Sequence, residues 1–207
     1  MGKIKDLMVE FEDEDLIEEV ESQLKAGAQP DAIIQECQDA MVAIGDQFSE
    51  GELFVSDLMM AGAMFKEVSE ALAPYIEGGE AGASKGVVVL GTVKDDIHDI
   101  GKDIVGTMLS ASGFEVIDLG VDVEPEKFVA AVKDSGAKVL ALSCLLASCY
   151  GSILDTVNAV AEAGLRDDVK IIIGGGPIDQ HVVDYSGADT FGGAAQETVD
   201  YCEKVYA

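Results

Sequence analysis

Apolar residues recur every three or four positions over the first third of the chain, from Lys3 to Ile76. This spacing is typical of amphipathic helices. It predicts four short helices, of which the third begins at Pro30 and frays at Gly45 and Gly51, and the fourth follows Ser56 as its N-cap. Short connections between them indicate an antiparallel bundle. The positions expected to face its core are Ile4, Leu7, Met8, Phe11, Leu16, Ile17, Val20, Leu24, Ile33, Ile34, Cys37, Met41, Ile44, Leu58, Met59, Ala63, Phe65, Val68 and Leu72.

The pattern changes after residue 86, where the apolar runs become too short for helices. Fully apolar, mostly β-branched runs that alternate with helical segments indicate parallel strands buried on both faces. The strands are expected at residues 87–93, 116–119, 139–142 and 171–173, with a weaker fifth at 189–191. Helices are expected at residues 100–112, 125–135 and 152–163, with a last helix that ends near Tyr206. The predicted fold class is a Rossmann-like, flavodoxin-like α/β domain with five parallel strands, preceded by an all-α four-helix bundle.

A glycine-rich segment at residues 78–86 separates the two patterns and is typical of a flexible linker. The sequence therefore predicts a helical domain at residues 1–77, a linker at 78–86 and an α/β domain at 87–207. With 207 residues and a hydrophobic content of 48%, the chain can fill a core in each domain.

The chain is strongly acidic, with 40 acidic against 13 basic residues and a formal net charge of -27. Nucleic acids and anionic membranes would be repelled, so neither is an expected partner. Residues 1–84 contain 20 of the acidic and 4 of the basic side chains. This acidity serves either solubility or complementarity to a basic partner.

The four cysteines show no CxxC spacing, and the first ten residues contain no continuous apolar segment. No run of about eighteen apolar residues occurs, so the sequence predicts neither a secreted nor a membrane-spanning protein. A cytoplasmic protein with reduced thiols is expected.

Polar side chains follow the ends of the predicted strands, where ligands gather in a parallel doubly wound sheet. Those strand ends are residues 94–98, 143–149, 174–177 and 192–195. Asp96 and His98 are close enough for the carboxylate to accept a hydrogen bond from one imidazole nitrogen, which leaves the other nitrogen free. Metal-ligating histidines have this arrangement. An ordinary loop histidine is the alternative.

A metal site made only of protein ligands is not indicated, because zinc or iron needs three or four of them. The second half offers one further histidine, His181, expected in an exposed helix, and cysteines without clustered spacing. A single protein ligand suffices when a macrocycle supplies the others, which points to haem or corrin. The glycines at 101 and 174–176 are either ordinary turn residues or leave a slot for a bulky group. A dinucleotide is disfavoured, because the GxGxxG spacing is absent.

Three motifs in order resemble those of cobalamin-binding domains. Asp96-Ile-His98-Asp-Ile-Gly101 matches the D-x-H-x-x-G motif, Ser143-Cys-Leu145 matches the S-x-L element, and Gly174-Gly175 matches the paired glycines of a later strand. The first half resembles the helical cap module of methionine synthase and of the corrinoid proteins of methyltransferase systems. Its residues 45–54 look like the G-D-x-F...G-x-x-F stretch of that cap. The resemblance covers essentially the whole chain.

The resemblance implies a role for each matching residue. His98 would be the lower axial ligand of cobalt, in place of the cofactor's own base, and Asp96 would hold its second nitrogen. The remaining cofactor-binding residues would be Asp95, Ile97 and Asp99 at the lower corrin face, Gly101 as the glycine of the motif, Ser143, Leu145, Ala147, Gly174, Gly175 and Ala195 along the tail of the cofactor, and Phe48 and Val55 of the cap over the upper face. In the family a hydroxyl residue completes the His-Asp pair. The matching position here is Cys149, with Ser148 beside it, and either could complete the proton relay.

By the same resemblance, the cofactor is cobalamin, as methylcobalamin or a related corrinoid, and the chain is a methyl-carrier subunit rather than an autonomous enzyme. It would accept a methyl group on cobalt from a substrate-specific methyltransferase and pass it to a second methyltransferase that acts on tetrahydrofolate or a thiol. The cobalt would cycle between Co(I) and methyl-Co(III) in the base-off, histidine-on mode. A reductive-activation protein is a further expected partner. The sequence does not choose among methanol, methylamines, betaines and methoxyarenes as the methyl donor.

Three other functions are alternatives to methyl carriage. A cobalamin-dependent sensor or regulatory module would need an effector, normally a basic DNA-binding domain, for which this chain has neither the room nor the charge. The cofactor subunit of a carbon-skeleton mutase shares the D-x-H-x-x-G domain but lacks the helical cap. A receiver-like interaction domain without a cofactor is the least specific alternative.

Overall fold

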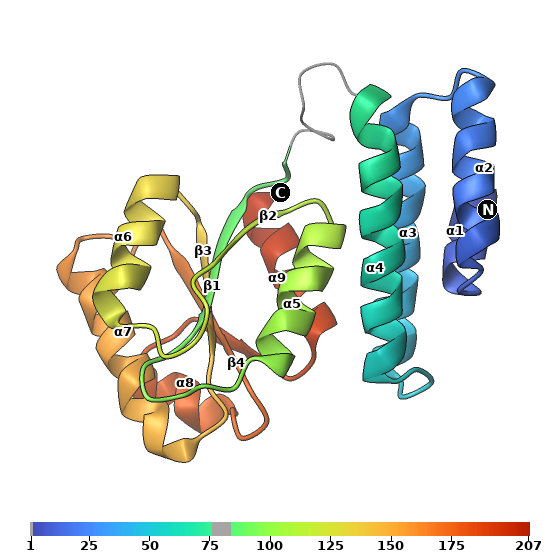
Figure 1. Cartoon of the computed structure of the whole chain (residues 1–207). Helices are drawn as coiled ribbons and strands as arrows, with labels where there is room; N and C mark the ends of the chain where they lie inside the picture. Colours follow the sequence, from blue (N-terminus) through green and yellow to red (C-terminus); the bar gives the residue numbers. More distant parts are fainter. Residues whose placement is uncertain (1, 76–83) are drawn as a thin grey trace. The chain divides into compact units, whose positions relative to one another are not determined.

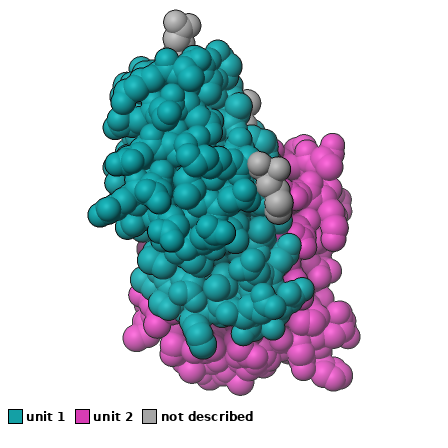
Figure 2. Space-filling view, turned by 90° about the vertical axis from the view of Figure 1, so that its right-hand side faces the viewer, with its two compact units in different colours: residues 1–84, 111–113 teal, residues 85–110, 114–207 magenta. Residues whose placement is uncertain are grey.

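The computed structural model describes residues 2–75 and 84–207 (Figure 1). These residues form two compact units, residues 1–84 with 111–113 and residues 85–110 with 114–207 (Figure 2). The linker predicted at residues 78–86 falls mostly on residues 76–83, which lie outside the described residues. Within the described ranges, no helix has the length and apolar character needed to cross a membrane.

The first unit is an all-α bundle, as predicted. Its helices are α1 (Lys3–Val9), α2 (Asp13–Lys25), α3 (Pro30–Ser49) and α4 (Val55–Leu72), followed by a 3-10 turn at Ala73–Tyr75. Helix α1 packs against α2 and α3, and α3 packs against α4. The side chains that fill the interior are Ile4, Met8, Leu16, Val20, Ile33, Cys37, Met41, Ile44, Leu58, Ala61, Met64, Val68 and Leu72.

The connection between α3 and α4 differs from the prediction. Helix α3 continues through Gly45, and Gly51, with a φ of 81°, provides the left-handed residue that follows its end. Helix α4 begins one residue before Ser56, so Ser56 is not the N-cap. Asp57 satisfies this helix end instead, because its Oδ2 accepts a hydrogen bond from the backbone N–H of Phe54 at 2.7 Å.

The buried face of α4 also differs from the prediction. Met59 and Ala63 were expected in the core, but both are exposed. The first half of α4 is apolar around most of its circumference, so spacing alone does not identify the inner face. Leu58, Ala61 and Met64 occupy that face.

The second unit contains a parallel sheet with the strand order β2-β1-β3-β4-β5 in the described residues. This order is that of flavodoxin-like folds, as predicted. The strands are β1 (Val87–Thr92), β2 (Glu115–Asp118), β3 (Val139–Ser143), β4 (Lys170–Gly174) and β5 (Thr190–Gly192). Each lies within one or two residues of its predicted bounds.

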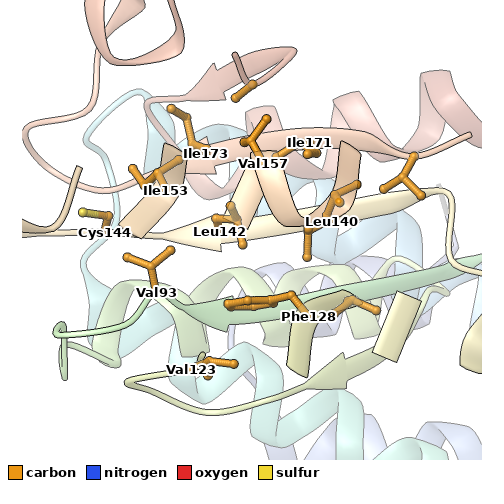
Figure 3. Close-up of a cluster of buried hydrophobic side chains, with 14 of the residues drawn as sticks. Val93, Val123, Phe128, Leu140, Leu142, Cys144, Ile153, Val157, Ile171 and Ile173 are labelled. Atoms are coloured by element: carbon orange, nitrogen blue, oxygen red, sulfur yellow. The ribbon is translucent and has the colours of Figure 1, made fainter. Parts of the chain in front are cut away.

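Helices cover both faces of the sheet (Figure 1). They are α5 (Ile100–Ala111), α6 (Pro125–Ser135), α7 (Tyr150–Glu162), α8 (Gln180–Ser186) and α9 (Ala195–Tyr206). Figure 3 shows the cluster on the face that packs against α6 and α7, where Phe128 and Ile153 meet Leu140, Leu142 and Ile173 of the strands. Full burial of each such side chain stabilises the fold by about 1.5–3 kcal/mol.

The register of the sheet aligns four strand ends in one row. Thr92 of β1 pairs with Ser143 of β3, Ser143 pairs with Gly174 of β4, and Gly174 pairs with Gly192 of β5. The segments that follow these residues therefore leave the sheet at the same edge. This edge is where the three sequence motifs meet.

Candidate functional site

Asp96 is the buried centre of the site, with a side chain that is 0% exposed. Its Oδ1 accepts a hydrogen bond from the backbone N–H of His98 at 3.0 Å and lies 2.6 Å from His98 Nδ1. Its Oδ2 accepts hydrogen bonds from the backbone N–H groups of Leu145 at 2.6 Å and Leu146 at 3.2 Å. Both oxygens therefore face donors, which compensates the burial of the charge.

This environment sets the protonation state of Asp96 and the hydrogen-bonding role of His98 Nδ1. Burial alone would raise the pKa of Asp96, but the hydrogen bonds from His98 and from the two leucine amides outweigh burial and lower the pKa below its usual 3.8. The carboxylate is ionised at neutral pH and can only accept, so His98 Nδ1 is the donor. In the tautomer with its proton on Nδ1, the ring has its lone pair on Nε2. Nε2 has no hydrogen-bond partner among the described residues, and the His98 side chain is 47% exposed.

Thr92 and the start of α5 position the His98 backbone. The hydroxyl of Thr92, which is buried at the end of β1, donates a hydrogen bond to the carbonyl oxygen of His98 at 2.8 Å. Helix α5 begins two residues after His98, at Ile100. The imidazole is therefore held by its backbone, by Thr92 and by Asp96, with Nε2 left accessible.

The proton relay expected through Ser148 or Cys149 is not what the structure shows. The Cys149 thiol donates to the carbonyl oxygen of Asp95 at 3.2 Å, and Ser148 Oγ lies 3.8 Å from Cys149 Sγ. The oxygen of Asp96 that Ser148 or Cys149 was expected to contact is Oδ2. It accepts hydrogen bonds from the backbone amides of Leu145 and Leu146 instead. The chain reaches Ser148 and Cys149 only in the following 3-10 turn, Ala147–Cys149.

Exposed apolar side chains gather around His98 at this edge. Ile97 and Ile100 are 72% and 70% exposed, and Leu145 and Leu146 are about 40% exposed. Exposed apolar clusters of this kind mark ligand or partner sites. The other predicted site residues of this unit are Asp95, Asp99, Gly101 and Ala147, which are exposed, Ser143 and Gly174, which are half-buried, and Ala195, which is buried at the start of α9.

Gly175 is required by the protein's own packing. Its φ is 139°, and a Cβ there would lie 1.9 Å from the carbonyl oxygen of Cys144. A Cβ at Gly174 would make only ordinary contact with Gly192, and one at Gly101 would meet nothing within 4 Å. Gly175 thus lets the end of β4 approach the end of β3. A slot for a cofactor tail beside this pair stays a prediction.

Two predicted site residues belong to the first unit. Phe48 is half-buried in α3, and Val55 is 38% exposed at the start of α4. Exposed Phe54 and Met59 lie close to Val55 in the sequence. The role of Phe48 and Val55 over a cofactor stays a prediction.

Lys102 was not predicted and lies directly after the motif glycine. Its side chain is only 3% exposed, and its Nζ contacts Asp103 at 2.5 Å and also Asp118 at the end of β2. Burial would lower the pKa of Lys102, but hydrogen bonds to the two carboxylates outweigh burial and raise the pKa above 10.5. Lys102 therefore ties the start of α5 to the end of β2.

The Lys102→Met variant is expected to unfold with a free energy about 1–3 kcal/mol lower than the wild type near neutral pH, because two charged hydrogen bonds are lost. Since the folded state raises the pKa of Lys102, this contribution is complete below pH 10.5 and declines as pH rises through the raised value. Urea unfolding of both proteins at about pH 8 and about pH 11 checks this. If the wild type and Lys102→Met differ in free energy of unfolding by as much at about pH 11 as at about pH 8, the ion-pair explanation is contradicted.

Comparison with protein families identifies the family to which the chain belongs. One B12 binding domain family matches residues 86–201, and a second B12 binding domain family matches residues 2–73. The chain belongs to the B12-binding family. Together the two family models cover most of both units.

Individual relatives agree with the B12-binding assignment. The chain is 37% identical to trimethylamine corrinoid protein 2 of Methanosarcina mazei over 201 residues, which cover 96% of this chain and 92% of that protein. A crystal structure of a cobalamin-binding protein from Desulfitobacterium hafniense matches with a TM-score of 0.83 and 33% identity, covering 99% of this chain and 97% of that one. A chain of the methanol:cobalamin methyltransferase complex MtaBC from Methanosarcina barkeri matches with a TM-score of 0.86 and 26% identity, covering 98% and 78%.

The residues of this B12-binding chain fit a corrinoid. His98 offers one unpartnered, partly exposed nitrogen, whose tautomer is fixed by a buried carboxylate. Among the described residues, no group of three or more His, Cys, Asp or Glu could hold a metal ion by itself. The exposed apolar side chains beside His98 suit the face of a macrocycle. A cobalt ion held by a macrocycle and completed by one imidazole matches this set of donors.

Proposed function

We propose that the chain is a corrinoid methyl carrier that accepts a methyl group from a substrate-specific methyltransferase and passes it to a second methyltransferase. The observation that supports this most strongly is the match to a trimethylamine corrinoid protein over 96% of this chain and 92% of that protein. This match includes the helical unit as well as the α/β unit, so the chain has both parts of that corrinoid protein. The similarity to a chain of a methanol:cobalamin methyltransferase complex supports the same function.

When bound, the corrinoid would supply the cobalt centre that takes up and releases the methyl group. His98 Nε2 would ligate that centre, while Asp96 would keep the proton on Nδ1 and fix the orientation of the ring. Ile97, with Asp95 and Asp99 beside it, would lie against the lower face and exclude water. The buried charge of Asp96 is stabilised by backbone amides, so it does not depend on a side chain that must move.

The other site residues are assigned by the same proposal. Ser143, whose strand end lies in the same row as Gly174, would line the path of the cofactor's tail, and Gly101 would lie at the lower face. In the first unit, Phe48 and Val55 would shield the methyl-bearing face. The tail path also includes Leu145, Ala147, Gly175 and Ala195. Residues 1–77 would act as the cap and 78–86 as the linker to residues 87–207.

The proposed partners are two methyltransferases and a reductive-activation protein. With a net charge of -27, the chain is expected to favour partners with basic docking faces. The methyl donor and the final acceptor would follow from the identity of these two methyltransferases.

A methylation assay tests the proposal. The protein reconstituted with hydroxocobalamin and reduced would be mixed in turn with methyltransferases specific for trimethylamine, dimethylamine, monomethylamine, methanol, betaines and methoxyarenes, together with their substrates. We expect the absorption spectrum to change with one of these donor systems, and to revert when a thiol-methylating or tetrahydrofolate-methylating enzyme is added. A protein that binds the corrinoid but responds to no donor system would contradict methyl carriage and favour the sensor alternative.

A further inference from the structure

In the connection between β2 and α6, Asp122 contacts residues 95 and 96 of the loop that leads to His98. The backbone N–H of Asp122 donates to the carbonyl oxygen of Asp96 at 2.9 Å. The side-chain Oδ1 of Asp122 accepts from the backbone N–H of Asp95 at 2.8 Å. Asp122 therefore binds two successive residues of the loop, one through its backbone and one through its carboxylate.

The Asp95 backbone is held on both sides in an unusual conformation. Asp95 and Asp122 have φ values of 66° and 52°, and they are two of only three non-glycine residues with a positive φ in the described chain. This left-handed region is unfavourable for L-residues and persists where surrounding contacts enforce it. At Asp95 those contacts are the Asp122 carboxylate on the N–H and the Cys149 thiol on the carbonyl oxygen.

The left-handed turn at Asp95 directs the next side chain into the interior. Asp96 follows it immediately, and its carboxylate reaches the Leu145 amide and the His98 ring only from that buried position. A change in the Asp95 backbone would therefore shift Asp96 and, through it, the orientation of the imidazole.

The Asp122 side chain is not needed to join the neighbouring strands. Val93 and Val123 form a parallel bridge, and the N–H of Val123 donates to the carbonyl oxygen of Thr92 at 3.1 Å. These main-chain contacts do not involve the Asp122 carboxylate. The Asp122 carboxylate therefore holds the loop that contains Asp95 and is not needed for the pairing of the strands.

We infer that Asp122 is a positioning residue for His98: its carboxylate fixes the left-handed turn at Asp95 and so holds Asp96 and the imidazole in the orientation that ligates a corrinoid. This inference rests on the proposed corrinoid site and adds a contributor from the connection after β2, the one strand whose end was not expected to supply a site residue. Asp122 touches neither His98 nor the cofactor, so its effect passes through Asp95 and Asp96.

Three substitutions separate the carboxylate from the backbone conformation. Asp122→Gly removes the acceptor but tolerates the positive φ and keeps the backbone N–H. Asp122→Asn keeps an amide oxygen as acceptor and also tolerates the left-handed region. Asp189→Gly is the matched control, because Asp189 Oδ2 also accepts a backbone hydrogen bond, from Ile171 at 2.7 Å, at the opposite end of the sheet.

The readout is the ratio of histidine-on to histidine-off absorption after reconstitution with hydroxocobalamin, together with thermal unfolding of the apoprotein. We expect Asp122→Gly to lower the ratio about tenfold, as loss of an outer partner of a metal-binding histidine typically does, and Asp122→Asn to lower it about threefold or less. Asp189→Gly should lower the unfolding temperature and leave the ratio unchanged.

Two results would overturn the inference. In one, Asp122→Gly has the same ratio of histidine-on to histidine-off absorption as the wild type. In the other, Asp122→Asn lowers this ratio as much as Asp122→Gly does. If Asp122→Gly does not fold, Asp122→Ser, whose shorter hydroxyl does not reach the Asp95 N–H, replaces it with the same expected ratio. A wild-type protein without a histidine-on spectrum would instead refute the proposed corrinoid site.

Discussion

Substitution of His98 by alanine is expected to abolish the histidine-on spectrum of the protein reconstituted with hydroxocobalamin. His98 Nε2 is the unpartnered nitrogen of the site, and Asp96 has already fixed the proton on the other nitrogen. Without the ring, the remaining neighbours are aliphatic side chains and carboxylates that cannot replace an imidazole. Absorption spectroscopy and equilibrium titration with hydroxocobalamin check this. We expect binding to weaken by more than the roughly 10–100-fold that follows loss of an outer partner.

Asp96→Asn is the matched variant for this prediction. An amide has one oxygen, so it can satisfy either the leucine amides or the imidazole, but its NH₂ group must face donors on the other side. If the NH₂ group faces Nδ1, the ring proton moves to Nε2 and blocks ligation. We expect an intermediate spectrum and about 10–100-fold weaker binding. A spectrum of His98→Ala identical to that of the wild type would refute His98 as the ligand, whatever Asp96→Asn does.

Gly175→Ala is expected to destabilise the fold by about 3 kcal/mol or more. The new Cβ would lie 1.9 Å from the carbonyl oxygen and 2.7 Å from the carbonyl carbon of Cys144, at a φ of 139°. Neither backbone can yield cheaply, because the Cys144 N–H is bonded to the carbonyl oxygen of Gly174 at 2.9 Å. Movement of Cys144 would also displace the following amide of Leu145 from Asp96. Urea unfolding measures the loss.

Gly151→Ala provides the control for that measurement. Gly151 is the second residue of α7, and an added Cβ would meet nothing within 4 Å. Alanine at this position should leave stability unchanged or raise it by up to about 1 kcal/mol. Equal effects of Gly175→Ala and Gly151→Ala would show that the close approach at Gly175 is not a constraint.

Much of the α/β unit could be predicted from the sequence because its strands are buried on both faces. Runs such as residues 139–142 are continuously apolar, and no helix of that length could bury them. Because the carboxyl ends of parallel strands lie at one edge of the sheet, Asp96, His98 and the later motifs could be predicted to lie together. The helical unit was less determinate, since α4 is apolar on several sides and Met59 was wrongly expected inside.

The partners of Asp96 could not be predicted in the same way. Backbone amides carry no sequence signal, so the contacts from Leu145 and Leu146 depend on the turn that follows β3. The sequence shows only side chains, so it predicts Ser148 or Cys149 as the partner of the Asp96 carboxylate. Asp122 did have a signal: it lies beyond the carboxyl end of β2, and the rule applied to the other four strands would have included it.

The contacts of Asp96 join the ends of three strands through hydrogen bonds within the protein. Its carboxylate binds the loop after β3, its own segment follows β1, and its carbonyl oxygen accepts from the connection after β2. These contacts contribute to ordering the loops around the half-exposed imidazole, so they lower the conformational entropy that ligand binding has to offset. Loosening any of the three loops would thus weaken affinity without removing a contact to the ligand itself.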